Sequence, residues 1–273
     1  MWRMRIPIPQ QGDDPPDEIP PLAPAPEAED TLLHSPSSMY PGASSQALWE
    51  DGERVFYRGW RLGEDGSRRA ALFVLPVAGH PSSSTVDRLA HEYALKDELD
   101  AAWAVQPLEL IREGRKATLV LDDPNGTPLE SLLVGPMELR RFLRLSIAIV
   151  RALGGLHQRG LVHKDIKPVN ILVNRASGEA RLTGFGIASH LPRERQAPDP
   201  PENIGGTLAY MAPEQTGRMN RSIDSRSDLY SLGVIFYQML AGMLPFSATD
   251  PMEWVHCHIA RHPAPVDERV STA

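Results

Sequence analysis

The chain has 273 residues and a net charge of −7, with 41% hydrophobic and 23% charged residues. This composition is typical of a soluble globular protein, and no basic patch or arginine run points to nucleic acid as a partner. One cysteine, Cys257, excludes an intramolecular disulfide and predicts a cytoplasmic location, and no apolar run reaches the roughly 18 residues that span a bilayer.

The first 45 residues form a leader rich in proline, alanine, serine and acidic residues. The pairs Pro15-Pro16 and Pro20-Pro21 break any helix and favour extended geometry. Too few large apolar groups are present to offset the entropy of ordering, so we expect residues 1–45 to be disordered. A docking tail for a proline-binding partner is one interpretation, and a leader without a role is the other.

Residues 46–123 alternate apolar and polar positions in short runs, which predicts a small antiparallel sheet with one helix. The turn Gly63–Gly66 joins the first two strands, and Pro124-Asn125-Gly126 marks a break that we expect to be a hinge. The strand candidates are Val55–Tyr57, Ala70–Leu75, Ala104–Ile111 and Ala117–Leu121, and the helix candidate is Val86–Leu99.

Residues 124–273 are predicted to be mainly helical. Glu138–His157 has helical spacing of its apolar residues and is followed by Gly160, a residue that commonly ends helices. Ser227–Leu240 is apolar nearly all round, which predicts a buried helix, and Pro251–Arg261 predicts one more. The apolar stripe of the first helix is predicted to comprise Leu139, Phe142, Leu143, Ile147, Val150, Leu153 and Leu156.

Between these helices, Leu161–Val173 reads L-V-H-K-D-I-K-P-V-N-I-L-V. An aspartate, a lysine two residues on and an asparagine three beyond that suit phosphoryl transfer. The carboxylate of Asp165 can accept a hydroxyl proton, the ammonium of Lys167 can balance γ-phosphate charge, and the amide oxygen of Asn170 can ligate a metal ion.

This stretch matches H-R-D-x-K-x-x-N, with Lys164 in place of arginine, and residues 160–246 resemble the C-lobe of a eukaryotic-type serine/threonine protein kinase. The other motifs that carry the resemblance are Phe185-Gly186, Ala212-Pro213-Glu214 and Asp228, which resembles the buried aspartate that braces the catalytic loop. The resemblance implies a two-lobed α+β protein-kinase fold. Its N-lobe would span 46–123, and its C-lobe would span 124–273 and be incomplete at its C-terminus.

The resemblance also implies ATP and Mg²⁺ as cofactors of an active domain, and a protein substrate. Asp165, Lys167, Asn170 and Thr207 would be catalytic, with Asn170 as the metal ligand. The hinge residues Leu121, Asp122 and Asp123 would contact the nucleotide through their backbone, and we expect the two aspartate side chains to face solvent. Glu92 would be the helix glutamate that pairs with a lysine of the N-lobe.

A finer resemblance concerns the stretch L-T-G-F-G-I-A at 182–188 and L-P-R-E-R-Q at 191–196. It is similar to the N-terminal kinase-like domain of large bacterial multidomain sensor proteins, which continue into an ATPase module, a GAF domain and a histidine kinase. This similarity implies fused downstream signalling domains as partners.

The sequence departs from the family pattern at three places where the family binds the nucleotide and its metal ion. Gly184 stands where the metal-binding aspartate is expected, and our alignment puts Phe73 in place of the N-lobe lysine, which leaves Glu92 without a cation. The glycine-rich loop is replaced by 48–54, where Glu50, Asp51 and Glu53 would repel a triphosphate.

Two hypotheses follow: a serine/threonine kinase with unusual nucleotide handling, or a catalytically inactive pseudokinase that regulates or scaffolds fused domains. The three losses favour the second, because each removes a phosphate or metal contact. A small-molecule kinase that shares H-x-D-x-x-x-x-N is a third alternative.

Two further clusters have weaker functional interpretations. His256, Cys257, His258 and His262 suggest a metal site, but His256 and His258 point to different sides of a helix, so ordinary histidines are the better interpretation. Arginines 193, 195, 218 and 221 suggest a phosphate receiver, although a solvated loop face explains them as well.

Overall fold

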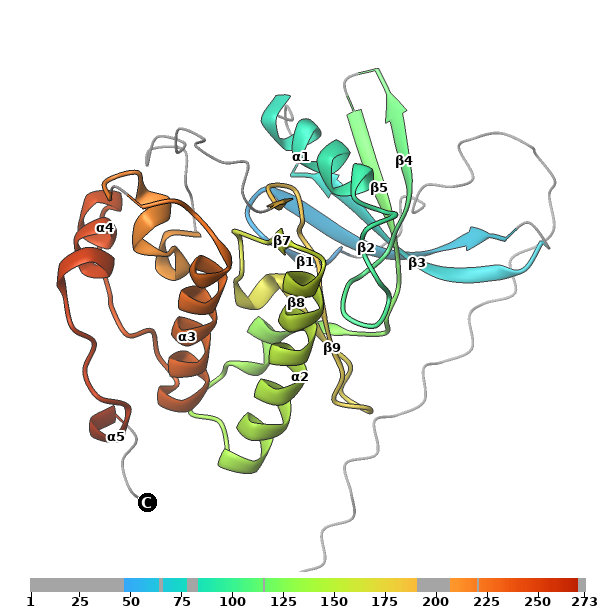
Figure 1. Cartoon of the computed structure of the whole chain (residues 1–273). Helices are drawn as coiled ribbons and strands as arrows, with labels where there is room; N and C mark the ends of the chain where they lie inside the picture. The colour runs from blue at the N-terminus through green and yellow to red at the C-terminus, as the bar shows by residue number, and fades with distance from the viewer. Residues whose placement is uncertain are drawn as a thin grey trace, which may run out of the picture. The chain divides into compact units, whose positions relative to one another are not determined.

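The computed structural model describes residues 47–63, 66–77, 83–114, 116–190, 207–219 and 221–269. The predictions for the leader 1–45 and for Arg193 and Arg195 lie outside the described residues. The described chain has a mixed α+β architecture, with a sheet followed by a mainly helical part (Figure 1). No helix in these ranges is both long and apolar enough to cross a membrane.

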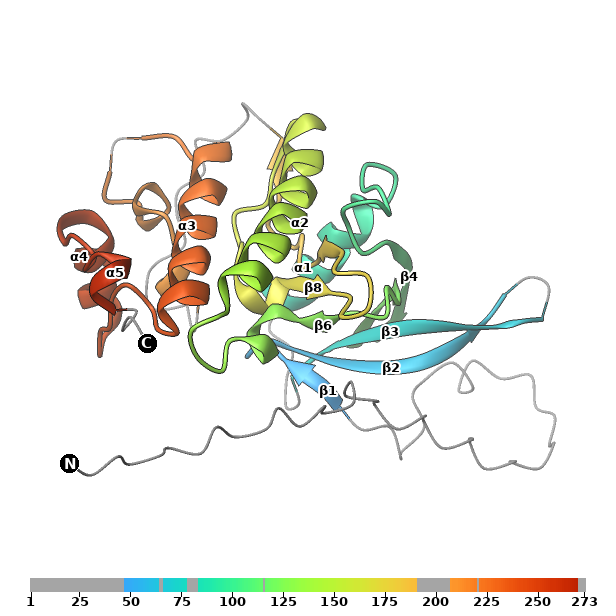
Figure 2. The same cartoon turned by 90° about the horizontal axis from the view of Figure 1, so that it is seen from below.

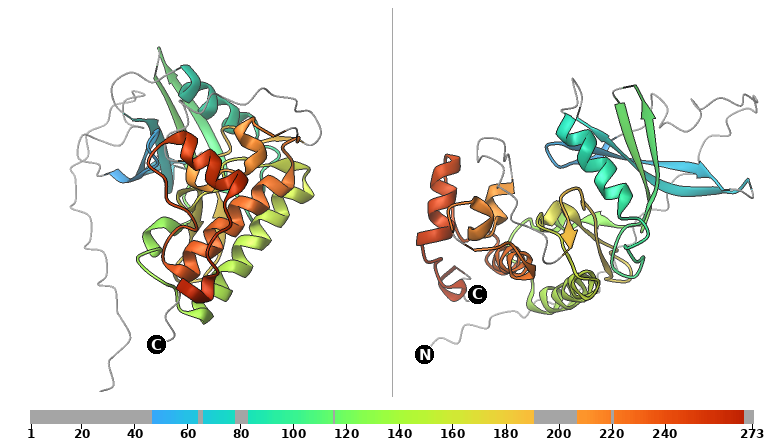
Figure 3. Two further views of the ribbon diagram at one scale, coloured as in Figure 1. Left: turned by 90° about the vertical axis from the view of Figure 1, so that its left-hand side faces the viewer. Right: turned by 45° about the horizontal axis from the view of Figure 1, so that its top comes forward.

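The sheet has five antiparallel strands in the order β1-β2-β3-β5-β4, and helix α1 packs on β4 and β5 (Figures 1 and 3). Strands β2 and β3 are longer than predicted because they pair along their full length, from Arg54 opposite Pro76 to Leu62 opposite Arg68. The elements are β1 Ala47–Glu50, β2 Arg54–Leu62, β3 Arg68–Pro76, α1 Ser83–Ala94, β4 Pro107–Glu113 and β5 Lys116–Asp122.

The two faces of β3 carry different residues. Leu72 and Val74 pack in one cluster with Leu89 of α1, whereas Phe73 packs with Val120 on the opposite face. Since side chains alternate along a strand, a shift of one residue in an alignment moves every side chain to the other face. The prediction that Phe73 stands where the lysine is expected was therefore wrong, and Val74 faces helix α1.

Helix α2, Leu139–Gln158, begins at the N-cap Glu138, whose side chain accepts hydrogen bonds from the backbone N–H groups of Arg140 and Arg141. The predicted stripe was partly wrong. The buried apolar face consists of Leu145, Ile149, Ala152, Leu153 and Leu156, whereas Leu139, Leu143, Ile147 and Val150 are exposed.

Helix α3, Ser225–Ala241, lies beside α2 (Figures 1 and 2) and is buried along most of its length, although Leu229 is exposed. It ends at Gly242, whose φ of 71° is the left-handed cap geometry that glycine adopts readily. The remaining elements are β6 Thr127–Pro128, η2 Leu129–Leu132, β7 Leu161–Val162, η3 Pro168–Asn170, β8 Ile171–Val173, β9 Ala180–Leu182, β10 Ser189–His190, η5 Thr207–Tyr210, η6 Pro213–Thr216, α4 Pro251–Ala260 and α5 Val266–Arg269.

Trp103 fixes the segment before β4 against the helical part. It packs edge-on against Phe185, and its backbone C=O accepts a hydrogen bond of 2.8 Å from Leu182 N–H. A Cβ on Gly155 of α2 would lie 2.3 Å from the Trp103 ring, so glycine is needed for this approach. β9 also pairs with β8, and Thr183 N–H donates to the backbone oxygen of Asn170 at 3.0 Å, so Gly184 follows next to Asn170 of the catalytic-loop stretch.

Candidate active site

The loop between β7 and β8 brings together the three residues predicted from their spacing. Lys167 Nζ lies 3.0 Å from Asp165 Oδ2, and Asn170 Nδ2 donates to the backbone oxygen of Asp165 at 2.8 Å and to its Oδ2 at 3.0 Å. Lys164 takes a left-handed conformation with φ of 68°, which turns the chain between β7 and Asp165. The carboxylate, the ammonium and the amide therefore form one hydrogen-bonded group.

Asp228 of α3 holds this loop in place. Its two carboxylate oxygens accept hydrogen bonds from the backbone N–H groups of His163 at 2.9 Å and Lys164 at 2.8 Å, and His157 Nε2 lies 2.9 Å away. Asp228 is 1% exposed, so these bonds are made away from water and are costly to lose. The predicted bracing role of Asp228 is confirmed.

Arg54, at the start of β2, points into the same region. Its guanidinium lies 3.3 Å from Glu92 Oε2, contacts Asp51 Oδ2, and donates to Asn170 Oδ1 at 3.2 Å. The side chains of Arg54, Glu92 and Asp51 are 9%, 1% and 2% exposed. The guanidinium also lies over the ring of Phe56, 5.4 Å from its centroid. A buried cation from β2 therefore joins helix α1, the β1–β2 turn and the catalytic loop.

The charges in this cluster stabilise one another. Burial alone would lower the pKa of Arg54, but the carboxylates of Asp51 and Glu92 outweigh it and raise that pKa. Burial would likewise raise the pKa of Asp51, but the neighbouring Arg54 guanidinium lowers it below its ordinary value. Arg54 and Asp51 are therefore both charged over the physiological pH range.

The expectation that Glu92 has no cation to pair with was wrong, because Arg54 supplies one from another strand. The other carboxylate oxygen of Glu92 accepts a hydrogen bond of 3.0 Å from the backbone N–H of Gly184. Glu92 thus links α1 both to β2 and to the segment after β9. The predicted repulsion at the β1–β2 turn is also reduced, since Asp51 pairs with Arg54 and Glu53 pairs with Arg88 at 2.7 Å.

Gly184 packs tightly against Asn170. A Cβ at this position would lie 2.7 Å from the Cγ and Oδ1 atoms of Asn170, and the φ of Gly184 is 84°, in the left-handed region. The space for a side chain at the expected metal-binding position is therefore already filled by the amide of Asn170, which Arg54 and Asp165 hold from two sides.

The hinge residues do not all lie as predicted. Leu121 is buried at the end of β5, and Asp122 donates its backbone N–H to the backbone oxygen of Gln106 at 2.8 Å. The side chain of Asp123 was expected to face solvent, but it is 3% exposed because Arg58 of β2 covers it, with Nε 2.5 Å from Asp123 Oδ2. An ion pair therefore ties the hinge to the sheet.

Thr207 opens the short helix η5, and its predicted contact with Asp165 and Lys167 stays a prediction. Arg54 is the functional residue that sequence reasoning missed. Alternation along β2 could have indicated its position, since Arg54 and Phe56 must lie on one face of the strand. The same alternation on β3 puts Leu72 and Val74 on one face of that strand.

The suggested histidine site is a structural cluster. His258 is buried, with Nε2 2.8 Å from the backbone oxygen of Leu208 and Nδ1 2.8 Å from the hydroxyl of Tyr230. Burial lowers the pKa of His258, although the hydrogen bond to Leu208 opposes this, so the ring is neutral at pH 7. No group of three or more histidine, cysteine or acidic side chains suited to a metal occurs within the described ranges.

We expect His258 to make stability pH-dependent. Its folded pKa lies below the ordinary value of 6.5, so the unfolded chain takes up a proton first as the pH falls. The contribution of His258 to the free energy of unfolding should be constant well above pH 6.5 and should decrease as the pH falls through that value, by at most about 1.4 kcal/mol per pH unit. Urea unfolding of His258→Gln between pH 8 and 5.5 should show a smaller decrease, whereas His262→Gln, at an exposed position, should match the parent protein.

Taken together, the sheet with its helix, the braced catalytic loop and the Asp165–Lys167–Asn170 group define a protein-kinase fold. A family model described as "Protein kinase domain" matches residues 68–270, which is more than half of the chain. The chain therefore belongs to the protein kinase family.

Several relatives of this chain are bacterial serine/threonine kinases. Serine/threonine-protein kinase pkn2 of Myxococcus xanthus is 34% identical over 219 residues, which cover 77% of this chain and 26% of that protein. PknA of Mycobacterium tuberculosis is 38% identical over 159 residues, 56% of this chain and 35% of the relative. Pkn1 of M. xanthus is 36% identical over 154 residues, which cover 54% of this chain and 21% of that protein. The matches thus span between about a fifth and a third of these relatives.

Active members of this family use ATP and Mg²⁺, and the residues present do not fit that pair. In protein kinases a β3 lysine contacts the phosphates and the metal ions bind an aspartate and the catalytic-loop asparagine. Here Val74 is on the face of β3 that packs with α1, position 184 is a glycine without ligand atoms, and the Asn170 oxygen already accepts from Arg54. One cavity lined by Arg54 has a volume of ≈ 20 Å³, which is room for about one water molecule.

The apolar side chains near the hinge are buried against one another. Phe56 of β2, Leu72 of β3, Leu121 of β5 and Leu172 of β8 belong to one cluster, and each is at most 1% exposed. A purine placed among these four side chains would have to displace them.

Proposed function

We propose that this domain is a pseudokinase: a kinase fold that keeps its catalytic loop ordered without nucleotide, transfers no phosphate, and acts as a regulatory or scaffold module. The observation that carries the proposal is Arg54, whose guanidinium lies between Glu92, Asp51 and Asn170. The Arg54 guanidinium thus takes the place of two other cations, the N-lobe lysine that pairs with the helix glutamate and the metal ion at the asparagine.

Electrostatics support the same conclusion. A triphosphate carries several negative charges and binds where positive charge and backbone N–H groups are free to receive it. The positive charge of Arg54 is already balanced by two buried carboxylates. Nucleotide binding would require breaking this cluster, and leaving its carboxylates unpaired would cost several kcal/mol.

For the whole protein we propose a cytoplasmic signalling role in which this domain regulates fused downstream domains. The relatives that it matches are much longer than the matched region, which leaves room for further domains in proteins of this kind. The similarity of 182–188 to the kinase-like domain of multidomain sensor proteins points to a sensor histidine kinase as the fused partner.

The test is a titration with ATP, with and without Mg²⁺, followed by calorimetry and by thermal unfolding. We expect no binding heat and no stabilisation at 1 mM nucleotide. A dissociation constant of about 10 μM would instead stabilise the domain by about 2.7 kcal/mol at this concentration, which a melting curve detects easily. A saturable, Mg²⁺-dependent heat would overturn the proposal, and a related active kinase domain serves as the positive control.

One observation favours a second candidate function, an unusual serine/threonine kinase. Asp165 Oδ1 is buried and has no hydrogen-bond partner within the described residues, while Lys167 lies beside the other oxygen. A free carboxylate oxygen at this place is what a hydroxyl group of a protein substrate would need. Phosphate transfer from labelled ATP to a test protein, abolished by Asp165→Asn, would establish this candidate and exclude the pseudokinase.

A further inference from the structure

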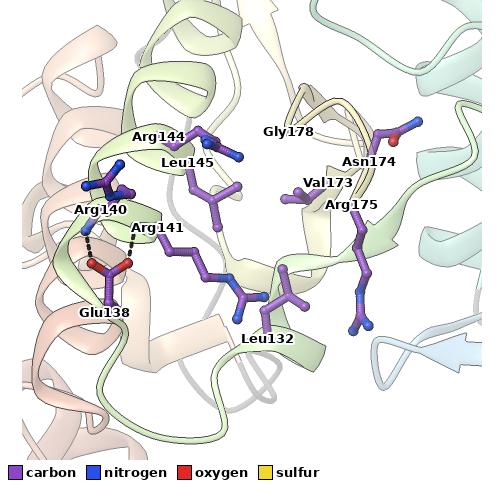
Figure 4. Close-up of a pocket in the computed structure, with 10 residues that line it drawn as sticks. All are labelled: Leu132, Glu138, Arg140, Arg141, Arg144, Leu145, Val173, Asn174, Arg175 and Gly178. Atoms are coloured by element: carbon purple, nitrogen blue, oxygen red, sulfur yellow. Dashed lines mark hydrogen bonds between the residues drawn. The ribbon is translucent and has the colours of Figure 1, made fainter. Parts of the chain in front are cut away.

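A second cavity lies on the helical part of the chain, between the start of α2 and the turn that joins β8 to β9 (Figure 4). Its volume is ≈ 320 Å³, which is comparable to small ligand pockets. The residues that line it are Leu132, Glu138, Arg140, Arg141, Arg144, Leu145, Val173, Asn174, Arg175 and Gly178.

The cavity is strongly basic. Figure 4 shows Arg141 and Arg144 extending from α2, with Arg175 on the opposite side, whereas Arg140 lies at the outer edge. Within the described ranges, the guanidinium groups of Arg141, Arg144 and Arg175 form no ion pair with a carboxylate. Their positive charges are therefore available to a ligand from outside.

The one carboxylate in the lining does not neutralise them. Glu138 accepts hydrogen bonds from the backbone N–H groups of Arg140 at 2.8 Å and Arg141 at 2.9 Å, as the dashed lines in Figure 4 show. These bonds lower the pKa of Glu138, which keeps it ionised as the cap of α2. Its oxygens are thus directed to the helix backbone.

The turn holds the second side of the cavity in shape. The Asn174 side-chain oxygen accepts from the backbone N–H groups of Ala176 and Ser177, which closes the turn after Arg175. A Cβ on Gly178 would lie 3.3 Å from Arg144 Cδ, so the stem of Arg144 runs close against the turn. Helix and turn together hold arginines on both sides of one space.

The floor of the cavity is apolar. Leu132, Leu145 and Val173 line it and are 7%, 4% and 1% exposed. Arginine forks bind phosphate oxygens in pairs, and an apolar floor favours a ligand that also carries hydrocarbon groups. Inorganic phosphate would use the arginines but would leave the floor uncovered.

We propose that this cavity binds a phosphorylated peptide segment of a partner protein, with the phosphate between Arg141, Arg144 and Arg175 and a neighbouring apolar side chain on the floor. This proposal is independent of the pseudokinase proposal, because none of its residues belongs to the Arg54 cluster. The helical part of the chain would then carry a surface that binds phosphopeptides.

The test is fluorescence anisotropy with a labelled nonapeptide that has Leu-phosphoserine-Leu at its centre. We expect saturable binding that weakens as salt is raised, and no binding of the same peptide with unmodified serine. Because each arginine would donate charge-assisted hydrogen bonds to the phosphate, Arg141→Ala combined with Arg175→Ala should weaken binding by about 100-fold or more. These side chains are exposed, so the variant should keep the melting temperature of the parent protein.

Arg151→Ala is the matched control, since Arg151 is an exposed arginine of α2 that does not line this cavity. Unchanged binding by the double variant would overturn the proposal, as would equal weakening by Arg151→Ala. Inorganic phosphate that displaces the peptide at equal concentration would show a simple anion site, and binding to phosphatidylserine vesicles without peptide binding would show a lipid surface. Either result would overturn the assignment of a peptide ligand.

Discussion

Replacing Arg54 with methionine is expected to lower the free energy of unfolding by about 3–5 kcal/mol, the usual cost of removing one partner from a buried ion pair. The substitution leaves the carboxylates of Glu92 and Asp51 in a region where they are 1% and 2% exposed. It also removes the hydrogen bond to Asn170. Urea unfolding monitored by circular dichroism measures the change.

Arg58→Met is the matched control for this prediction. Arg58 lies on the same strand and also pairs with a carboxylate, that of Asp123, but the Arg58 side chain is 40% exposed. Exposed ion pairs contribute about 0–1 kcal/mol, so this substitution should have a much smaller effect. Adding Glu92→Met to Arg54→Met should recover part of the loss, because one unpaired charge is then removed. Equal effects at Arg54 and Arg58 would contradict the buried-cluster interpretation.

Gly184→Asp, which restores the residue type expected at the metal position, should fail to create Mg²⁺-dependent ATP binding. The backbone cost of a non-glycine residue in a left-handed conformation is about 1–3 kcal/mol. The new Cβ would also lie 2.7 Å from Asn170, so that side chain would have to leave Arg54. We expect a less stable protein, and no nucleotide-dependent rise in its melting temperature.

Gly160→Asp is the control that separates the backbone cost of the substitution from the cost of the contact with Asn170. Gly160 has a φ of 74°, close to that of Gly184, but nothing lies within 4 Å of a Cβ built there. It therefore reports the backbone cost alone, and the additional loss in Gly184→Asp reports the contact with Asn170. If Gly184→Asp bound ATP in a Mg²⁺-dependent manner, the claim that the site is filled from within would be wrong.

Local spacing in the sequence predicted the parts of the site that lie within a few residues of one another. Asp165, Lys167 and Asn170 are near neighbours in the chain, and the structure brings them into one hydrogen-bonded group. Asp228 was also predicted, because its surrounding motif is specific. The Arg54 contacts could not be predicted in this way, since Glu92 is 38 residues and Asn170 is 116 residues away.

Two errors came from apolar runs that lack a clear polar side. In β3 the run Ala71–Leu75 is apolar at every position and both faces are largely buried, so alternation could not choose between Phe73 and Val74. In α2 the apolar residues cover more than one face, and periodicity alone did not show that Leu145 and Ile149 pack inward while Ile147 is exposed. In both cases, contacts with other elements decided the outcome.

The interlocked side chains around Asn170 bear on the evolutionary history of this domain. A lysine restored at position 74 would face a site that already holds the guanidinium of Arg54, and an aspartate at 184 would meet Asn170. Loss of Arg54 first would leave two buried carboxylates unpaired. If the domain descends from an active kinase, as the proposed function implies, each of these single substitutions back toward that kinase would give a less stable protein. Selection for stability would then oppose reversion one residue at a time, and a return to catalysis would need several of these changes at once.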